Sequence, residues 1–180
     1  MSGHSHWAGI KHKKGAADEK RGKVFSKLLA AVTAAVGTEP NQEFNPRLRT
    51  AIQKAKEANV PNENIERAVK RASEPGSGLE ELALEAYGPA GAAILIEAIT
   101  DSKNRTIAEV KKIISEAGAK WAEPGSVRWA FESVAAAEGG GWQAKFSPEL
   151  GAEDLSKLSE IIEALEKHED VQKVYTTAKL

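Results

Sequence analysis

One short stretch divides this sequence into two halves of different character: Glu74-Pro75-Gly76-Ser77-Gly78. A proline and two glycines interrupt a helical pattern here, and such a cluster marks a turn or a linker. Before it the apolar residues repeat at helical spacing, and after it the period changes. The stretch therefore predicts a domain boundary, with a basic helical domain over residues 1–75 and an α+β domain over residues 79–180.

The charge of the chain changes sign at the same place. Residues 1–75 contain 14 Lys and Arg against 8 Asp and Glu, a balance of +6, whereas residues 76–180 contain 11 against 18, a balance of −7. A basic half joined to an acidic half indicates that a polyanion is met by the first half only. A chance imbalance between solvated faces is the plainer alternative.

The first half reads as three amphipathic helices. The first runs from about residue 17 to Gly37, a natural C-cap residue. Asn45-Pro46 supplies an N-cap followed by proline at the first helical position, and Pro61-Asn62 restarts the chain as a third helix. Short helices with short connections are typical of a small bundle. Before residue 17 we expect an extended N-terminal arm.

The second half alternates strands and helices. Residues 92–100 form an apolar, β-branched run typical of a buried strand, and a helical pattern ending at Gly118 follows, with Thr100, Asp101 and Ser102 as capping side chains. Residues 126–132 and 141–146 predict two strands around a glycine turn. A second helix and a strand over residues 171–176 complete the order βαββαβ. The predicted class is therefore α+β and multidomain, a three-helix bundle followed by a ferredoxin-like βαββαβ domain.

Residues 79–87 fit this scheme less smoothly. Leu82, Leu84 and Ala86 alternate as in a strand, but the run LEELALEA suits a helix equally well. In a ferredoxin-like sheet both edges of the strand over residues 92–100 are already occupied. Residues 79–87 are therefore either a strand that displaces a neighbour or a helix, and both alternatives stay open.

The sequence predicts no catalytic, cofactor or metal site. It contains no nucleophile elbow, phosphate-cradling loop or zinc-protease motif, and it has no cysteine. Removal of Met1 would expose Ser2-Gly3-His4, which can wrap Cu(II) or Ni(II) in a square plane. Since no carboxylate or thiolate supports a dedicated site there, we regard that property as incidental.

The sequence also predicts no membrane partner and no secretory signal. No apolar run has the length of a membrane span, and no apolar region precedes Ala17. The lack of cysteine fits a reducing compartment.

Nucleic acid is the partner that the basic first half favours. Lysines and arginines neutralise phosphates and release counterions, and Trp7 could stack on an unpaired base or dock on the bundle. No fixed reader helix is evident, so recognition of phosphate and shape is better supported than base readout. The candidate nucleic-acid-binding residues are Trp7, Lys11, Lys13, Lys14, Lys20, Arg21, Lys23, Arg47, Arg49 and Arg105.

Several runs of the sequence resemble the YebC family. The similar runs are residues 2–11, 13–18, 20–28, 45–49, 59–68, 87–89, 100–106 and 125–127, together with the ending around residues 165–175. The resemblance implies a cytoplasmic, non-enzymatic regulator of gene expression that contacts nucleic acid. Bacterial members are described as probable transcriptional regulators and have been linked to ribosomes stalled on proline-rich nascent chains. Mitochondrial relatives act as translational activators.

On this basis we expect a ribosome- or rRNA-associated translation factor that relieves stalled elongation. A DNA-binding transcriptional regulator is the alternative. The expectation includes no small-molecule substrate, and it leaves the oligomeric state open.

The sequence departs from the family pattern in two ways. Family members usually carry a third domain inserted where only residues 133–141 stand here, which implies that this domain is missing. Ala31 stands where an acidic residue is common, and Ala90 and Ser102 replace a usual glycine and asparagine.

Overall fold

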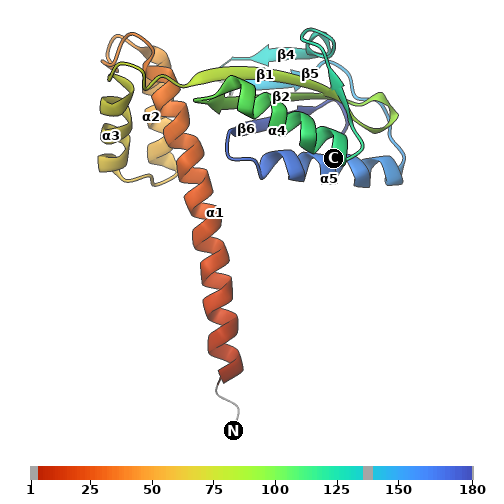
Figure 1. Ribbon diagram of the computed structural model, residues 1–180, viewed down its shortest axis with the longest axis horizontal. Helices are drawn as coiled ribbons and strands as arrows, with labels where there is room; N and C mark the ends of the chain where they lie inside the picture. Colours follow the sequence, from red (N-terminus) through yellow and green to blue (C-terminus); the bar gives the residue numbers. More distant parts are fainter. Residues whose placement is uncertain (1–3, 136–139, 180) are drawn as a thin grey trace. The chain divides into compact units, whose positions relative to one another are not determined.

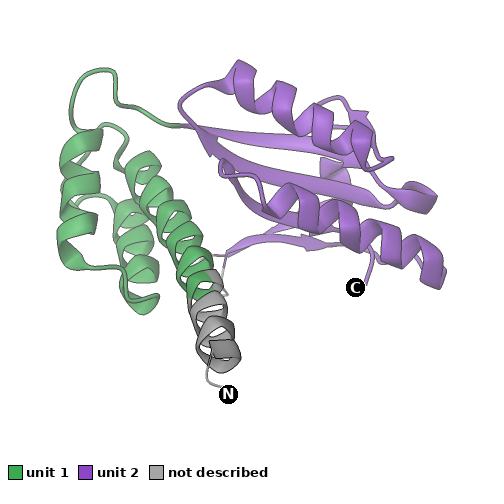
Figure 2. Cartoon of the chain, turned by 60° about the horizontal axis from the view of Figure 1, so that its bottom comes forward, with its two compact units in different colours: residues 1–79 green, residues 80–180 purple. Residues whose placement is uncertain are grey.

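The computed structural model describes the backbone of residues 4–135 and 140–179, and their side chains except those of residues 4–14 and Ala16. The chain divides into two compact units, unit 1 over Met1–Leu79 and unit 2 over Glu80–Leu180 (Figure 1, Figure 2). The division follows directly on the proline and glycines of residues 75–78.

Unit 1 consists of three helices, α1 (His4–Val36), α2 (Pro46–Glu57) and α3 (Asn62–Ala72). Their apolar residues recur at helical spacing, so each helix turns one stripe inward. The buried core that results contains Val32, Ala35, Val36, Leu48, Ala55, Val60 and Ile65. The predicted three-helix bundle is confirmed.

Asn45 joins the end of α1 to the start of α2. Its side-chain oxygen accepts a hydrogen bond from the backbone N–H of Leu48 at 3.0 Å, as an N-cap should. Its amide nitrogen donates to the carbonyl oxygens of Ala35 at 2.9 Å, Val36 at 3.2 Å and Glu39 at 2.8 Å. One side chain therefore satisfies backbone groups at two helix termini.

The helix α1 begins at His4, so the expected extended arm before residue 17 is wrong for the backbone from His4 onward. No proline occurs before Pro40, and alanine, lysine and glutamate favour helix, so nothing interrupts the backbone hydrogen bonding. Residues 17–24 are exposed. This part of α1 extends beyond α2 and α3, as Figure 1 shows.

Unit 2 is built on an antiparallel sheet of four strands in the order β3-β1-β2-β6. The strands are β1 (Glu80–Tyr87), β2 (Ala93–Thr100), β3 (Lys120–Ala122) and β6 (Val171–Thr176). Residues 80–87 are thus a strand, and the helical alternative for LEELALEA is wrong. The strand pairs with β2 along its whole length, because a short connection between antiparallel neighbours makes a hairpin.

The β1–β2 connection contains a strained residue. A 3₁₀ turn, η1 (Pro89–Gly91), links the two strands, and Ala90 within it has φ of 52° and ψ of 22°. This left-handed conformation is unfavourable for a residue with a Cβ atom and favours glycine. A glycine at this position would adopt the same conformation without that cost.

Two layers cover the two faces of this sheet. The helices α4 (Lys103–Glu116) and α5 (Ala152–Glu166) pack on one face, where Ile94, Ile96, Val110, Ile114, Leu158 and Leu165 form the main core. A hairpin of β4 (Phe131–Val134) and β5 (Gly141–Ala144), preceded by the 3₁₀ turn η2 (Arg128–Ala130), covers the other face through Leu95, Val127 and Phe131. Since both faces of β2 are covered, its sequence is apolar almost throughout.

The α+β class and the element order βαββαβ are confirmed by β2, α4, β4, β5, α5 and β6. The strand pairing of a ferredoxin-like sheet is wrong. The hairpin partner β1 occupies one edge of β2 and β6 the other, so β4 and β5 form a separate two-stranded sheet. The strand expected over residues 126–132 begins only at Phe131.

The capping expected before α4 is also corrected. Ser102 is the N-cap residue but makes no side-chain capping hydrogen bond. The Thr100 hydroxyl oxygen instead accepts the Ser102 backbone N–H at 2.9 Å, and it lies 2.8 Å from the Thr106 hydroxyl oxygen.

Candidate nucleic-acid interface

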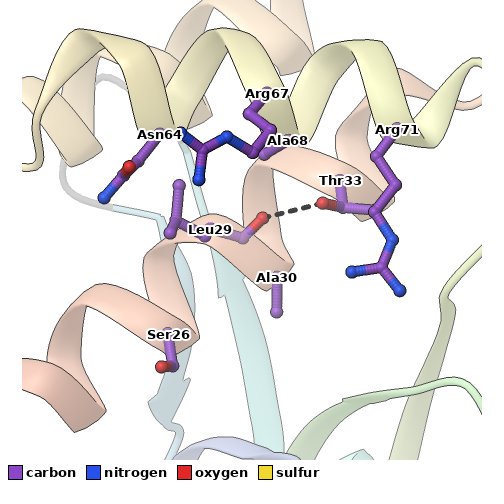
Figure 3. A pocket seen from close by; sticks show the side chains of 8 residues that line it. All are labelled: Ser26, Leu29, Ala30, Thr33, Asn64, Arg67, Ala68 and Arg71. Carbon is purple, nitrogen blue, oxygen red and sulfur yellow. Dashed lines mark hydrogen bonds between the residues drawn. The ribbon is translucent and has the colours of Figure 1, made fainter.

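A groove of about 420 Å³ runs between α1 and α3 in unit 1. Figure 3 shows its two walls. One is Ser26, Leu29, Ala30 and Thr33 of α1, and the other is Asn64, Arg67, Ala68 and Arg71 of α3. The spacing on each helix is three or four residues, so each wall is one face of one helix. We call Asn64, Arg67 and Arg71 the arginine face of α3.

The floor of the groove is apolar, and its polar groups are few. Leu29, Ala30 and Ala68 supply apolar surface. The Thr33 hydroxyl donates to the Leu29 carbonyl at 3.0 Å within α1 (Figure 3), so this hydroxyl is already engaged in the helix. The Asn64 amide, the Ser26 hydroxyl and the two guanidinium groups are therefore the polar groups that the groove offers to a ligand.

The charges of the arginine face are open to a ligand. Arg67 and Arg71 are exposed, and none of the carboxylates on the described side chains forms an ion pair with either of them. Glu63 and Glu66 belong to the same helix but are not part of the groove lining. Two guanidinium groups one helical turn apart present planar, bidentate donors to phosphate oxygens.

The predicted basic residues of α1 whose side chains are described lie on the part of the helix that precedes the groove residues. Lys20, Arg21 and Lys23 are all exposed. Lys23 lies one helical turn before Ser26 of the groove wall, and its ammonium group is 3.3 Å from the Glu19 carboxylate. That pair is exposed on both sides, so it holds the lysine only weakly.

The predicted residues nearest the start of the chain are only partly described. The backbone of Trp7, Lys11, Lys13 and Lys14 belongs to α1, and their side chains lie outside the described residues.

The two arginines predicted on α2 stand at its first turn. The Arg49 guanidinium donates to the carbonyl oxygens of Gln42 at 3.3 Å and Glu43 at 3.2 Å. It braces the connection between α1 and α2. Arg47 is exposed at the same end of the helix.

The last predicted residue, Arg105, is bonded within unit 2. Its guanidinium lies 3.0 Å from the carboxylates of both Asp170 and Asp101, and 3.3 Å from the Thr100 hydroxyl. The hydrogen bond to Asp170 is the main cause that raises the pKa of Arg105. We call Arg105 with Asp101, Asp170, Thr100 and Thr106 the Arg105 network.

Asp170 is the centre of the Arg105 network. It accepts from the Thr106 hydroxyl at 2.6 Å as well as from Arg105. Burial acts to raise the pKa of Asp170, but the hydrogen bonds from Thr106 and Arg105 outweigh it and hold the pKa below its usual value.

A His and two carboxylates approach one another beside this network. The ligand atoms of Glu109, His168 and Asp170 lie within 4.8 Å of one another. His168 Nε2 is 2.9 Å from Glu109, and Nδ1 accepts the Asp170 backbone N–H at 3.1 Å. A cation here would face the Arg105 guanidinium, which is bonded to the same Asp170 oxygen.

The residues that the sequence predicts to bind nucleic acid do not include the arginine face. Arg67 and Arg71 read in the sequence as outward positions of an amphipathic helix, alongside five other cationic residues of the bundle. Arg67 and Arg71 differ from the other cationic positions in that they recur with Asn64 at spacings of three and four and lie opposite one face of α1. That pairing of faces requires the helix packing and is not visible in either helix alone.

Two family models match successive parts of the chain. The model described as TACO1/YebC protein N-terminal domain matches residues 5–75, and the model described as TACO1/YebC second and third domain matches residues 79–141. A relative from Desulfosudis oleivorans is 44% identical over an alignment of 185 positions, which covers 97% of this chain and 74% of that protein. The chain belongs to the TACO1/YebC family.

Two further comparisons agree with this assignment. A relative from Dictyoglomus thermophilum is 53% identical over 135 residues, 73% of this chain, and the chain covers 54% of its length. Both relatives bear the name "Probable transcriptional regulatory protein". The crystal structure of a conserved hypothetical protein from Aquifex aeolicus is similar at a TM-score of 0.83 and 32% identity, over 97% of each chain.

Across the described residues, no helix of this TACO1/YebC protein combines the length and the apolarity that crossing a membrane requires.

Proposed function

We propose that this TACO1/YebC protein is a non-enzymatic regulator of gene expression that binds nucleic acid through unit 1. The observation that carries the proposal is the arginine face of α3, whose two exposed guanidinium groups lack ion-pair partners among the described side chains and line a groove beside basic α1. The regulatory name of the relatives supports the class of function.

The binding surface that we propose joins the groove to the exposed part of α1. Arg67 and Arg71 would contact phosphates at the groove, and Lys20, Arg21 and Lys23 would extend the contact along α1. Lys11, Lys13 and Lys14 continue the same helix toward its start. A long cationic helix with neighbouring arginines suits a phosphate backbone, and such contacts make binding strongly salt-dependent.

Within this class we favour ribosomal RNA and a role as a translation factor that relieves stalled elongation. Among the described side chains, the cations are spread along a helix and a groove and do not gather into a compact reading surface for base edges. Folded RNA is recognised mainly through shape and phosphate contacts, so this spread favours RNA.

The alternative target is DNA, with a role as a transcriptional regulator. The name of the relatives favours it. A helix that is exposed all round has the dimensions to enter the major groove of B-form DNA, and α1 offers such a segment over residues 17–24.

Ribosome profiling of a deletion strain separates the two roles. We expect codon-specific pausing to increase while transcript levels at individual promoters stay constant. Changed transcript levels without changed pausing would contradict the translation role and favour the DNA alternative.

Sedimentation of the full chain with ribosomes provides a direct check of the partner. We expect co-migration at low salt and release at high salt, since phosphate contacts weaken as salt rises. The variant with Lys11, Lys13 and Lys14 all replaced by Ala should be released at lower salt. Failure of the wild-type chain to co-migrate even at low salt would count against a ribosomal partner.

A further inference from the structure

A pair of exposed aromatic rings lies in unit 2. Trp129 of η2 is 63% exposed and Phe146, which follows β5, is 47% exposed. Their ring centroids are 5.6 Å apart and the ring planes meet at 29°, so the two rings stack. Large aromatic side chains that stay outside the core and gather on the surface are typical of binding interfaces.

A hydrogen bond from its ring nitrogen holds the indole of Trp129 in place. Its Nε1–H donates to the Ser126 carbonyl oxygen at 2.8 Å, and the same oxygen accepts the Tyr87 hydroxyl at 3.0 Å. Tyr87 belongs to β1, so the indole is tied to the central sheet through one carbonyl group. Its polar atom is satisfied internally, which leaves the ring itself for a ligand.

The loop before Trp129 is fixed by a buried carboxylate. Glu85 is only 3% exposed, and its oxygens accept the backbone N–H groups of Gly125 at 2.7 Å, Val127 at 2.6 Å and Arg128 at 3.1 Å. Burying a carboxylate is costly, and these three hydrogen bonds compensate for it. The exposed ring thus sits on a pre-organised loop, and pre-organisation lowers the entropy lost on binding.

Each ring has a cationic residue beside it in the chain. Arg128 precedes Trp129, and its guanidinium lies 4.8 Å over the ring of Trp142. Lys145 precedes Phe146 and is exposed, and its backbone N–H donates to the Ala130 carbonyl at 2.9 Å. That hydrogen bond brings the two segments side by side. Aromatic rings interleaved with cations are the combination found in sites for single-stranded nucleic acid.

We propose that Trp129 and Phe146 form a stacking platform for an unpaired base of single-stranded nucleic acid, with Arg128 and Lys145 near the flanking phosphates. Proline-rich peptides bind in grooves lined by separated aromatic side chains. Here the two rings stack directly on each other and leave no groove between them. This arrangement favours a single flat ligand that stacks on an outer face of the pair. This surface is distinct from the arginine face of α3 and extends the proposed function to a second contact.

The charges around the platform predict how it differs from unit 1. Glu123, Glu132 and Glu149 are exposed in the same segments as Arg128 and Lys145. Because charges of both signs surround the rings, we expect stacking to supply most of the binding affinity and attraction to phosphates to supply little of it. Binding at the platform therefore depends weakly on salt, unlike binding at the arginine face.

The test measures binding of the full chain to a fluorescein-labelled single-stranded RNA of about a dozen nucleotides, which is within the usual range of site sizes. Trp129→Ala should weaken binding by about tenfold. The slope of the logarithm of affinity against the logarithm of salt should stay unchanged, because no charge is lost. Trp129→Phe should keep most of the affinity, since it keeps a stacking ring.

The matched control is Phe44→Ala, which removes another exposed aromatic ring, 73% exposed, from unit 1. We expect wild-type affinity for this variant. The circular dichroism spectrum should be unchanged in all three variants, since each replaces a largely exposed side chain. The thermal midpoint of the two Trp129 variants should fall slightly, because the hydrogen bond to the Ser126 carbonyl is lost.

Wild-type affinity of Trp129→Ala for the RNA would overturn the platform and leave the arginine face untouched. Equal losses for Trp129→Ala and Phe44→Ala would also overturn it. A proline-rich peptide that binds the wild-type chain and not Trp129→Ala, while RNA binding is unaffected, would assign the rings to a peptide instead.

Discussion

The arginines of α3 in unit 1 and Arg105 of α4 in unit 2 show opposite uses of the same side chain. Arg67 and Arg71 line a groove without an ion-pair partner on any described side chain. Arg105 is bonded to two carboxylates and a threonine hydroxyl of its own unit. All three arginines are exposed to solvent, so exposure alone does not distinguish them.

The two sites differ in whether carboxylates of the same unit neutralise the arginine charge. A guanidinium that is already bonded to carboxylates has little to gain from a phosphate, because the phosphate must displace or approach those carboxylates. A guanidinium without a carboxylate partner gains an opposite charge when a phosphate binds. The same contrast follows the net charge of the two halves, basic before the linker and acidic after it.

The largest expected effect comes from removing the arginine face. The double variant Arg67→Ala with Arg71→Ala should lower affinity for single-stranded RNA at low salt by at least about tenfold, because two phosphate contacts are lost. Fluorescence anisotropy with the full chain measures the effect. Arg105→Ala is the matched control and should keep wild-type affinity. An equal loss in Arg105→Ala would break the distinction between the two sites.

The second effect is on stability and concerns the Arg105 network. Asp170→Ala should lower the free energy of unfolding by about 1–3 kcal/mol, because Thr106 and Arg105 both lose a hydrogen-bond acceptor. Urea unfolding measures it. Asp101→Ala removes an exposed carboxylate from the same guanidinium and should cost less than about 1 kcal/mol. If the two variants were equally destabilised, Asp170 would have no special place in the network.

The network also predicts a pH dependence in the acid range. The folded pKa of Asp170 lies below its unfolded value because hydrogen bonds from Thr106 and Arg105 outweigh burial. Its stabilisation is therefore complete above the unfolded pKa of about 3.9 and is lost as pH falls through the folded value. Urea unfolding of the wild type and of Asp170→Asn should differ above about pH 4 and converge below it. A constant difference down to the lowest pH would contradict this assignment.

The smallest effect concerns the exposed part of α1. Gly22 lies inside the helix with open space where a Cβ would stand. Gly22→Ala should stabilise the helix by roughly 0.5–1 kcal/mol, because alanine loses less backbone entropy. Far-ultraviolet circular dichroism on heating measures it. A fall in helix content would show that Gly22 is needed in another conformation.

Much of the fold follows from local signals in the sequence. Asn45-Pro46 predicts the start of α2 and its cap, and the β-branched run before Thr100 predicts β2. These signals are complete within a few residues. The pattern over residues 171–176 likewise predicts β6 at its observed bounds.

The sheet pairing could not be predicted because it depends on competition for one edge. The alternation at Leu82 and Leu84 is equally compatible with a strand or a helix until β2 is present as a partner. Once β1 takes that edge, the two strands around the glycine turn have only each other.

The candidate site also has a part that the sequence predicts and a part that depends on the fold. Basic composition predicts which unit meets a polyanion, but not which cations stay open to it. Arg105 has an acidic partner 65 residues away in the chain, at Asp170, which no local pattern reveals. The arginine face likewise depends on how α3 packs against α1.

The central claim is that the open cations of unit 1 bind phosphate. The most direct measurement is the slope of the logarithm of RNA affinity against the logarithm of salt concentration, for the wild type, the Arg67→Ala and Arg71→Ala double variant, and Arg105→Ala. We predict a slope shallower by about two in the double variant, roughly one for each lost phosphate contact, and a wild-type slope in Arg105→Ala. A wild-type slope in the double variant would contradict the account.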